Sequence, residues 1–242
     1  MNIPCQDAHL YRVLPHGELL IAVADGAGSA ARSKEGAERA IEQVAASLEV
    51  ALKEQSPEDE VGWKTIVVEA FCEAREALVQ LAMAENDSLR SFSTTLTCAI
   101  VSDRWLVVGQ IGDGVAVAET STGAMFVAVR PQRGEYANEA YFLTMSDALQ
   151  YVEVQSYAQQ TRALAVTTDG LLRLALKLPE YEPHPPFFQP LIAFVTEAKD
   201  DGQAKEQLIT FLCSDRVCAR TDDDKTLVLA TCSIPSEGTH TI

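Results

Sequence analysis

The sequence has few positive charges, no long hydrophobic run and no basic segment at its beginning. It holds 19 Lys and Arg against 35 Asp and Glu, which gives a formal net charge of −16. Such a surface repels the phosphates of nucleic acids and anionic lipids. No apolar stretch approaches the roughly 20 residues that cross a bilayer, and the start MNIPCQDAHL lacks the pattern of a signal peptide. We therefore expect a cytoplasmic protein that binds divalent cations and has no nucleic-acid or membrane partner.

Typical zinc and disulfide patterns are also missing. The six cysteines form no Cys-x-x-Cys pair, and Cys72, Cys98 and Cys232 lie inside apolar segments, so we expect free, buried thiols. The four histidines are scattered, without a partner at ligand spacing. The glycine-rich loop that starts at Asp25 lacks the Gly-Lys-Ser/Thr ending of a nucleotide-binding loop, and no serine stands in a Gly-x-Ser-x-Gly setting. These absences argue against zinc enzymes, nucleotide-binding proteins and serine hydrolases.

The length and composition suit one globular domain over residues 1–242, because 47% of the residues are hydrophobic and 22% are charged. Short apolar runs predict strands, and apolar residues at three- and four-residue spacing predict helices. We expect strands at 18–24, 93–101, 105–111, 115–120, 124–129, 162–168 and 226–231, and helices at 32–55, 62–84, 191–199 and 204–212.

Three segments lack a regular pattern. Residues 130–160 lose periodicity, which predicts a loop with a short helix or strand. Residues 178–190 hold five prolines and are predicted to form an exposed connection. The tail from residue 233 is predicted to fray.

The strands come in consecutive groups, with pairs of helices between the groups instead of one helix after each strand. This order favours antiparallel sheets over a parallel sheet with alternating helices. We therefore predict an α+β fold in which two stacked antiparallel sheets are flanked by antiparallel helix pairs, an α-β-β-α sandwich.

Acidic residues stand where the predicted strands end. Asp25, Asp113 and Asp169 each follow an apolar strand and precede a glycine, Asp223 precedes the last strand, and Asp7 lies near a first strand. Carboxylates at strand ends converge at one edge of a sheet. Together they repel one another unless a cation neutralises them, and hard divalent cations prefer such oxygen ligands. The pattern therefore predicts a binuclear Mg²⁺ or Mn²⁺ site.

A turn is the alternative interpretation of each acidic position. Asp-Gly is a common turn pair, in which the aspartate bonds to its own backbone. For any single pair the turn is the better explanation, but turns alone do not explain why all these residues stand at the ends of apolar strands.

The ordered motifs resemble the type 2C, metal-dependent Ser/Thr protein phosphatases, above all their compact bacterial members. The motifs are Gln-Asp-Ala, Val-Ala-Asp-Gly-x-Gly-Ser, Ser-Thr-Thr-Leu, Ile-Gly-Asp-Gly, Thr-Thr-Asp-Gly-Leu and Asp-Asp-x-Thr-Leu-Val, spread from Gln6 to Leu229. Each motif alone is weak, but the full ordered set is specific. The resemblance implies stacked sheets with the metals in a cleft at one sheet edge, and hydrolysis of phosphoserine and phosphothreonine in proteins.

The resemblance also implies metal ligands. It makes Asp25 the bridging ligand between two metals, and it makes the carbonyl oxygen of Gly26 a further ligand that completes the coordination shell of one of them. It assigns Asp169 and Asp223 to the other metal, where the spacing to Thr226 favours Asp223 over its acidic neighbours on both sides.

Two further carboxylates and a flap follow from the same resemblance. Asp7 matches a carboxylate that orients metal-bound water, Asp113 matches a position that helps to hold a third, weaker metal, and residues 130–160 match the variable flap beside the cleft. Cations lower the pKa of water and offset the charge that develops on a transferring phosphoryl group, so no covalent phosphoenzyme is needed.

The sequence departs from the family pattern at three positions. Gln6 stands where the family usually has Glu, Asn2 where many members have a phosphate-binding Arg, and Ala27 where a His serves as a candidate general acid. The phosphate-binding residue is therefore unknown. These departures motivate a second hypothesis, a weakly active or inactive phosphatase fold that binds phosphoproteins and regulates them.

Three cations are candidates to replace the missing arginine: Arg12, Arg32 and Lys34. Each is more commonly an ordinary surface charge. The activity itself implies a partner Ser/Thr kinase that phosphorylates the substrate.

Overall fold

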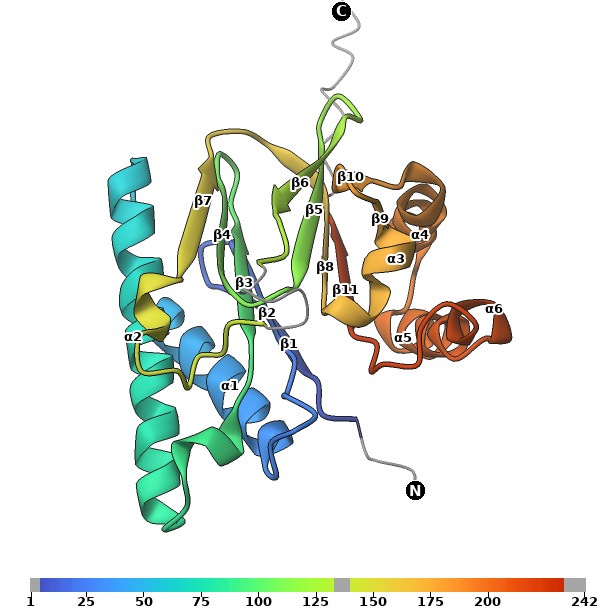
Figure 1. Ribbon diagram of the computed structural model, residues 1–242. Helices are drawn as coiled ribbons and strands as arrows, with labels where there is room; N and C mark the ends of the chain where they lie inside the picture. The colour runs from blue at the N-terminus through green and yellow to red at the C-terminus, as the bar shows by residue number, and fades with distance from the viewer. Residues whose placement is uncertain (1–4, 133–139, 233–242) are drawn as a thin grey trace, which may run out of the picture.

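The computed structural model describes residues 5–132 and 140–232, so the tail predicted to fray lies outside the described residues. Two antiparallel sheets stack face to face, and helices cover the two outer faces (Figure 1). The predicted α-β-β-α sandwich is confirmed. In the described part of the chain, no helix combines the length and hydropathy needed to cross a membrane.

The first sheet has the order β1-β2-β3-β4-β7 and the second the order β11-β8-β5-β6. The strands of the first sheet are β1 Ala8–Val13, β2 Leu19–Ala24, β3 Leu96–Val101, β4 Leu106–Ile111 and β7 Glu153–Tyr157. Those of the second are β5 Val115–Thr120, β6 Met125–Val129, β8 Thr161–Thr167 and β11 Leu227–Thr231, and β9 Leu176–Lys177 pairs with β10 Glu182–Pro183 beside it. The helices are α1 Ser33–Ala51, α2 Glu60–Ala84, α3 Leu172–Ala175, α4 Pro185–Glu197, α5 Asp201–Leu212 and α6 Asp215–Cys218, with short 3-10 turns η1 Leu89–Phe92, η2 Ala148–Gln150 and η3 Asp169–Leu171.

The central strands are buried on both faces, which explains their continuous apolar runs. In β2, Ile21 and Val23 face the second sheet, whereas Leu20, Ala22 and Ala24 face the layer of α1 and α2. The second sheet repeats this arrangement, because alternate residues of β8 face the first sheet and the layer of α3, α4 and α5. Three apolar layers therefore hold the strand ends in fixed positions.

Helix α2 packs directly on the backbone of β4. A Cβ atom added at Gly109 would lie 2.4 Å from Cγ1 of Val67 and 2.9 Å from Cε2 of Phe71. Because Val67 and Phe71 are fully buried, only glycine lets the helix come this close to the strand.

The structure corrects the prediction for one irregular segment and agrees with the prediction for another. The exposed connection predicted for 178–190 is wrong from Pro185 onward, because α4 begins there and buries Phe187 and Phe188. Proline suits the first turn of a helix, where its missing N–H has no intrahelical partner in any case. In the described part of the segment 130–160, the predicted short elements are η2 and β7, and β7 forms the edge of the first sheet beside β4.

The described cysteines are free, as expected, but most of them are not buried. Cys98 is fully buried and Cys72 is half-buried. Cys232 is exposed, so its predicted burial is wrong. It follows directly after the end of β11.

The contact between α2 and β4 predicts the effect of adding one methyl group. We expect Gly109→Ala to lower the free energy of unfolding by about 1–3 kcal/mol, because the new Cβ overpacks the core. The control is the double variant with Val67→Ala, which removes the clashing methyl groups, so its loss should be smaller than the sum of the two single losses. Urea unfolding of the four proteins measures this coupling, and additive losses would contradict the contact.

Candidate active site and metal centre

Three carboxylates meet at one edge of the stacked sheets. Asp25 follows β2, Asp113 lies in the turn between β4 and β5, and Asp169 follows β8. One carboxylate oxygen from each lies within 4.8 Å of the other two. The three aspartates that were expected to converge from strand ends therefore do lie together.

Two threonines hold the backbone of Asp25. The Asp25 N–H donates to Oγ1 of Thr95 over 2.9 Å. The carbonyl oxygen of Asp25 accepts from the N–H of Thr95 at 2.9 Å and from Oγ1 of Thr94 at 3.0 Å. The Ser-Thr-Thr motif thus fixes the turn that carries Asp25, a role the sequence did not reveal.

Gly26 occupies a position with no room for a side chain. A Cβ atom there would lie 2.7 Å from the carbonyl oxygen of Gln6 and 2.8 Å from the carbonyl carbon of Ser33. The side-chain amide of Gln6 donates to Oγ of Ser33 over 2.7 Å. Chain segments before β1 and at the start of α1 therefore close tightly around Gly26. The use of its carbonyl as a ligand stays a prediction.

Asp7 joins the cluster from the segment before β1. Its Oδ2 accepts from Oγ1 of Thr168 at 2.8 Å, and Oγ1 of Thr168 in turn accepts from the N–H of Thr226 at 3.3 Å. Its Oδ1 is buried without a hydrogen-bond partner among the described residues. Thr168 therefore fixes one carboxylate oxygen of Asp7, and the carboxyl group itself lies beside that of Asp25.

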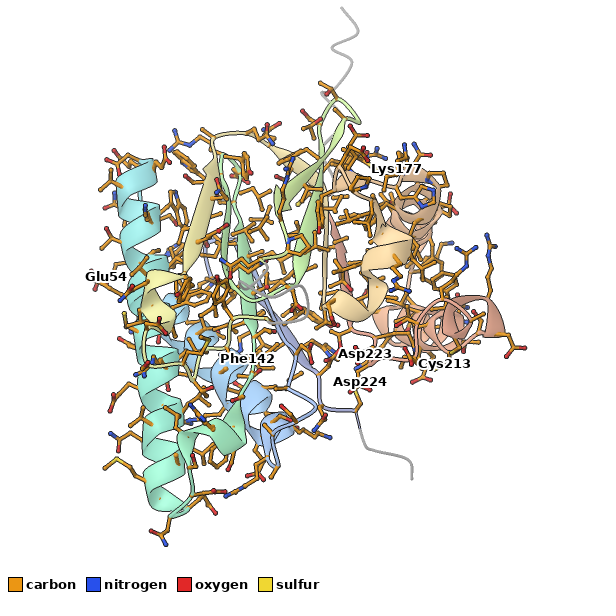
Figure 2. The ribbon with its side chains drawn as sticks, viewed as in Figure 1. Glu54, Phe142, Lys177, Cys213, Asp223 and Asp224 are labelled. Atoms are coloured by element: carbon orange, nitrogen blue, oxygen red, sulfur yellow. The ribbon has the colours of Figure 1, made fainter. Side chains whose placement is uncertain are left out.

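Asp223 lies outside the group of three. Its side chain is exposed on the loop before β11, where Figure 2 labels it beside Asp224. Asp224 has a different task, because its Oδ2 accepts from the N–H of Gln6 at 2.7 Å. A Cβ at Gly170 would lie 1.9 Å from the carbonyl oxygen of Asp224, so this loop packs tightly against the end of β8. Asp223 thus stands at the rim of the site.

Burial and mutual repulsion raise the pKa of each clustered carboxyl group. For Asp25 the main cause is burial, followed by the charges of Asp7, Asp169 and Asp113, and its pKa rises to about 9. Burial and then the charges of Asp113 and Asp223 raise the pKa of Asp169. Burial is also the main cause of the raised pKa values of Asp7 and Asp113. None of the main causes of these shifts is a cationic side chain of the described residues.

The donor set fits hard divalent cations. Oδ1 of Asp113, like Oδ1 of Asp7, is buried and has no hydrogen-bond partner among the described residues. Carboxylate oxygens that lack a donor and repel one another are the ligands that Mg²⁺ and Mn²⁺ take in proteins. The arrangement supplies negative charge and unpaired carboxylate oxygens at a point where none of the described residues forms an ion pair with them.

Two buried glutamines tie the β4–β5 turn to the flap segment. Nε2 of Gln110 donates to the carbonyl oxygens of Gly112 and Arg130, both at 2.9 Å. Gln132 accepts from the N–H of Gly112 at 2.8 Å and donates to the carbonyl oxygen of Tyr151 at 2.7 Å. The start of the segment predicted as a flap is therefore fixed to the end of β4 and to the turn that carries Asp113, and Gln132 links it to Tyr151 further along the same segment.

The candidate phosphate-binding cations have other partners. Arg12 pairs with two glutamates of α1, and Arg32 pairs with Glu35 and Glu85. Lys34 is exposed at the start of α1 and forms no ion pair with a described residue. Asn2, which replaces the family arginine, lies outside the described residues.

Fold and site together define a class of protein, a stacked-sheet enzyme with a carboxylate centre for divalent cations. The chain belongs to the protein phosphatase 2C family, which it matches over residues 1–213. It is 34% identical to Serine/threonine-protein phosphatase 3 of Escherichia coli K12 over 237 residues, which cover 95% of this chain and 91% of that protein. The protein is therefore a metal-dependent Ser/Thr protein phosphatase that acts on phosphorylated proteins.

Solved structures share the fold. The Ser/Thr phosphatase Stp1 of Staphylococcus aureus superposes with a TM-score of 0.63 at 14% identity and covers 96% of this chain and 90% of its own. RsbX, solved in complex with magnesium, superposes with a TM-score of 0.53 at 15% identity over 94% of this chain and 87% of its own. At these identities the likeness concerns the fold alone.

The raised pKa of Asp25 predicts how the metal-free protein responds to pH. An unfolded aspartate has a pKa of 3.8, and the folded value is about 9. The group therefore contributes stability below pH 3.8 and loses it as the pH rises toward 9. We expect Asp25→Asn, which cannot ionise, to be more stable than the parent by about 1–3 kcal/mol at pH 8.5 in EDTA, and by less at pH 5.5.

Thermal unfolding at both pH values measures this difference. Asp222→Asn is the matched control, because Asp222 is exposed on the loop next to the site and its replacement should change stability equally little at both. A constant difference between Asp25→Asn and the parent across pH would show that Asp25 ionises normally in the folded protein.

Proposed function

We propose that the cluster of Asp25, Asp113 and Asp169 holds the Mg²⁺ or Mn²⁺ ions of this phosphatase, with Asp113 at a third and weaker site, and that its substrates are phosphorylated by a partner Ser/Thr kinase in the cytoplasm. The observation that carries the proposal is the meeting of three half-buried carboxylates within 4.8 Å, with no compensating cation among the described residues. We also propose that residues 1–242 form one catalytic domain, because both sheets contribute to the apolar layer between them.

The residues have distinct roles in this proposal. Asp25 would be shared by two cations, the carbonyl of Gly26 would complete the coordination shell of one of them, and Asp169 and Asp223 would hold the other. Asp113 takes part in a third, weaker site. Bound cations supply charge that lowers the pKa of water and offsets the negative charge on the phosphoryl oxygens.

Asp7 orients the attacking water. Thr168 donates to its Oδ2, which fixes the carboxylate plane and leaves Oδ1 to accept a proton of that water. Because Oδ1 is buried and has no described partner, an accepted hydrogen bond there removes an unmet demand instead of replacing another bond. The aspartate therefore aligns the water for in-line attack on phosphorus.

The ligand chemistry favours Mg²⁺ or Mn²⁺ over softer metals. The proposed ligands are all oxygen atoms, and no cysteine or histidine belongs to the described cluster. Oxygen-only sites suit Mg²⁺ and Mn²⁺, whereas zinc and copper prefer nitrogen or sulfur ligands. The fold neighbour RsbX was solved with magnesium, which supports the same choice.

The second hypothesis, an inactive regulatory domain, rests on Gln6, Asn2 and Ala27. The amide of Gln6 is engaged with Ser33, so it serves packing around Gly26. The clustered carboxylates and the 34% identity to a Ser/Thr protein phosphatase favour the enzyme.

Chelation and mutation test the metal site. The EDTA-treated protein should hydrolyse p-nitrophenyl phosphate and a phosphothreonine peptide only after Mg²⁺ or Mn²⁺ is added. Asp25→Ala and Asp169→Ala should each lower kcat/KM by at least about a hundredfold, equivalent to roughly 2.7 kcal/mol of transition-state stabilisation. Asp103→Ala, at the opposite end of the first sheet, is the control. Metal-dependent activity that survives in Asp25→Ala would overturn the assignment.

The three consecutive acidic residues before β11 allow a sharper test of Asp223. We expect Asp223→Ala to raise the Mn²⁺ concentration needed for half-maximal activity by about tenfold or more, because one charged ligand is lost. Asp222→Ala should leave that concentration unchanged. Asp224→Ala should mainly lower the melting temperature, since Asp224 anchors the N–H of Gln6. An effect on metal demand in Asp222→Ala instead would move the ligand by one residue.

A further inference from the structure

An open groove with a volume of about 490 Å³ follows strand β6 of the second sheet. Residues of β6 line one side, residues of the β9–β10 hairpin line the other, and the start of α4 completes it. Strand β10 lies beside β6 (Figure 1). We call this pocket the β6 groove. Its volume lies in the range of clefts that bind ligands.

The backbone of β6 forms part of the groove surface. Among the described strands, β6 pairs only with β5, so it is an edge of the second sheet. Met125, Phe126 and Val127 all line the groove, although successive side chains of a strand point to opposite faces. What these three neighbours share is the backbone edge of the strand. Such an edge offers N–H and C=O groups to an extended peptide.

The charged side chains of the groove are mainly positive, in a chain whose net charge is −16. Arg130 directly follows β6, and Lys177, which Figure 2 labels, ends β9. Both side chains are exposed, and neither forms an ion pair with a described residue. Glu182 is the one acidic residue among the lining residues, and it lies opposite Lys177 in the β9–β10 register. A ligand in the groove can therefore reach two unpaired cations.

One end of the β6 groove lies close to the carboxylate cluster. Nε2 of Gln110 donates to the carbonyl oxygens of Gly112 and Arg130, both at 2.9 Å, so these two oxygens lie within about 6 Å of each other. Asp113 directly follows Gly112. From Arg130 the groove follows β6 back to Gly123 in the β5–β6 turn, a length of roughly 20 Å at about 3.3 Å per residue. A peptide bound along it therefore starts near the metal centre and leads away from it.

We propose that the β6 groove binds an extended, acidic segment of the phosphorylated protein substrate, next to its phosphorylated residue. Carboxylates of that segment pair with Arg130 and Lys177, and its backbone lies along the edge of β6. A second copy of this chain fits the groove less well, because it brings its own net charge of −16. The inference rests on the phosphatase activity but not on the proposed set of metal ligands.

Phosphothreonine peptides with different flanks test the proposal. Each carries roughly six to eight residues on each side of the phosphothreonine, which matches the length of the groove, and glutamates replace glutamines on the N-terminal or the C-terminal side. We expect glutamates on one of the two sides to lower KM about three- to tenfold relative to the all-glutamine peptide, with kcat nearly unchanged, as a few exposed ion pairs do.

Salt and a substrate without flanks complete this measurement. The advantage of the acidic peptide should shrink in about 0.5 M NaCl, because salt screens exposed charges. Turnover of p-nitrophenyl phosphate reports the metal centre separately, so a defective centre is distinguished from an unused groove. If neither acidic peptide has a lower KM than the all-glutamine peptide at low salt, while p-nitrophenyl phosphate is hydrolysed, the proposal is overturned.

Charge removal in the groove locates the effect. We expect Arg130→Gln and Lys177→Gln each to raise KM for the preferred acidic peptide about two- to fivefold and to leave KM for the all-glutamine peptide nearly unchanged. Arg104→Gln is the matched control, because Arg104 is exposed in the β3–β4 turn, forms no ion pair with a described residue and gives the same change in net charge. An equal effect of Arg104→Gln would show that only the overall charge matters, which overturns the proposal.

A variant with the opposite expected sign separates recognition from damage to the fold. Glu182→Gln removes the negative charge opposite Lys177, so KM for the preferred acidic peptide should fall about twofold or more, and a rise in that KM would contradict the proposal. Sedimentation equilibrium of the parent and of Lys177→Gln tests the other occupant. A dimer of the parent that dissociates in Lys177→Gln would assign the groove to a second copy of the chain and overturn the proposal.

Discussion

Repulsion between buried carboxylates is the constraint on which the rest of this structure depends. Asp7, Asp25, Asp113 and Asp169 approach one another where little solvent screens their charges, and burial and mutual repulsion raise their pKa values. A protein keeps such a group together only if the backbone holds each member firmly or if a cation neutralises it. Here the backbone holds each aspartate in place, and the metal dependence of the family accounts for the neutralising cation.

The aspartates are held in place because the strands next to them are covered by apolar layers on both faces. Each clustered aspartate lies within two residues of a strand, because Asp25, Asp113 and Asp169 follow one and Asp7 immediately precedes β1. Two kinds of local contact then fix the positions of the groups at this sheet edge. Threonine hydroxyls fix the backbone of Asp25 and one oxygen of Asp7, and glycines allow other segments to approach within ordinary contact distance, as Gly170 does for the loop before β11. Apolar layers thus set the coarse positions, and hydrogen bonds set the fine ones.

The sequence was sufficient to predict the architecture and the meeting of three carboxylates, because both follow from apolar runs that end in Asp-Gly. It missed only the first half of α4, because it began this helix at residue 191 and not at Pro185, since five prolines outweighed the burial of Phe188. It also could not reveal the roles of Thr168, Gln110 and Gln132, because those bonds join segments far apart in the chain. The position of Asp223 at the rim depends on how its loop packs against Gly170, which no local pattern encodes.

The two ends of β2 pose the same electrostatic problem at different strengths. Asp25 shares its surroundings with other carboxylates, so only a multivalent cation with several open coordination positions offsets the charge. Glu18 stands alone, already accepts from Ser56, and lies beside indole rings. Glu18 has no second buried carboxylate beside it among the described residues, so nothing at this end of β2 requires a multivalent cation. The number of carboxylates that meet, and not the burial of any one of them, therefore distinguishes the metal centre from the other end of the same strand.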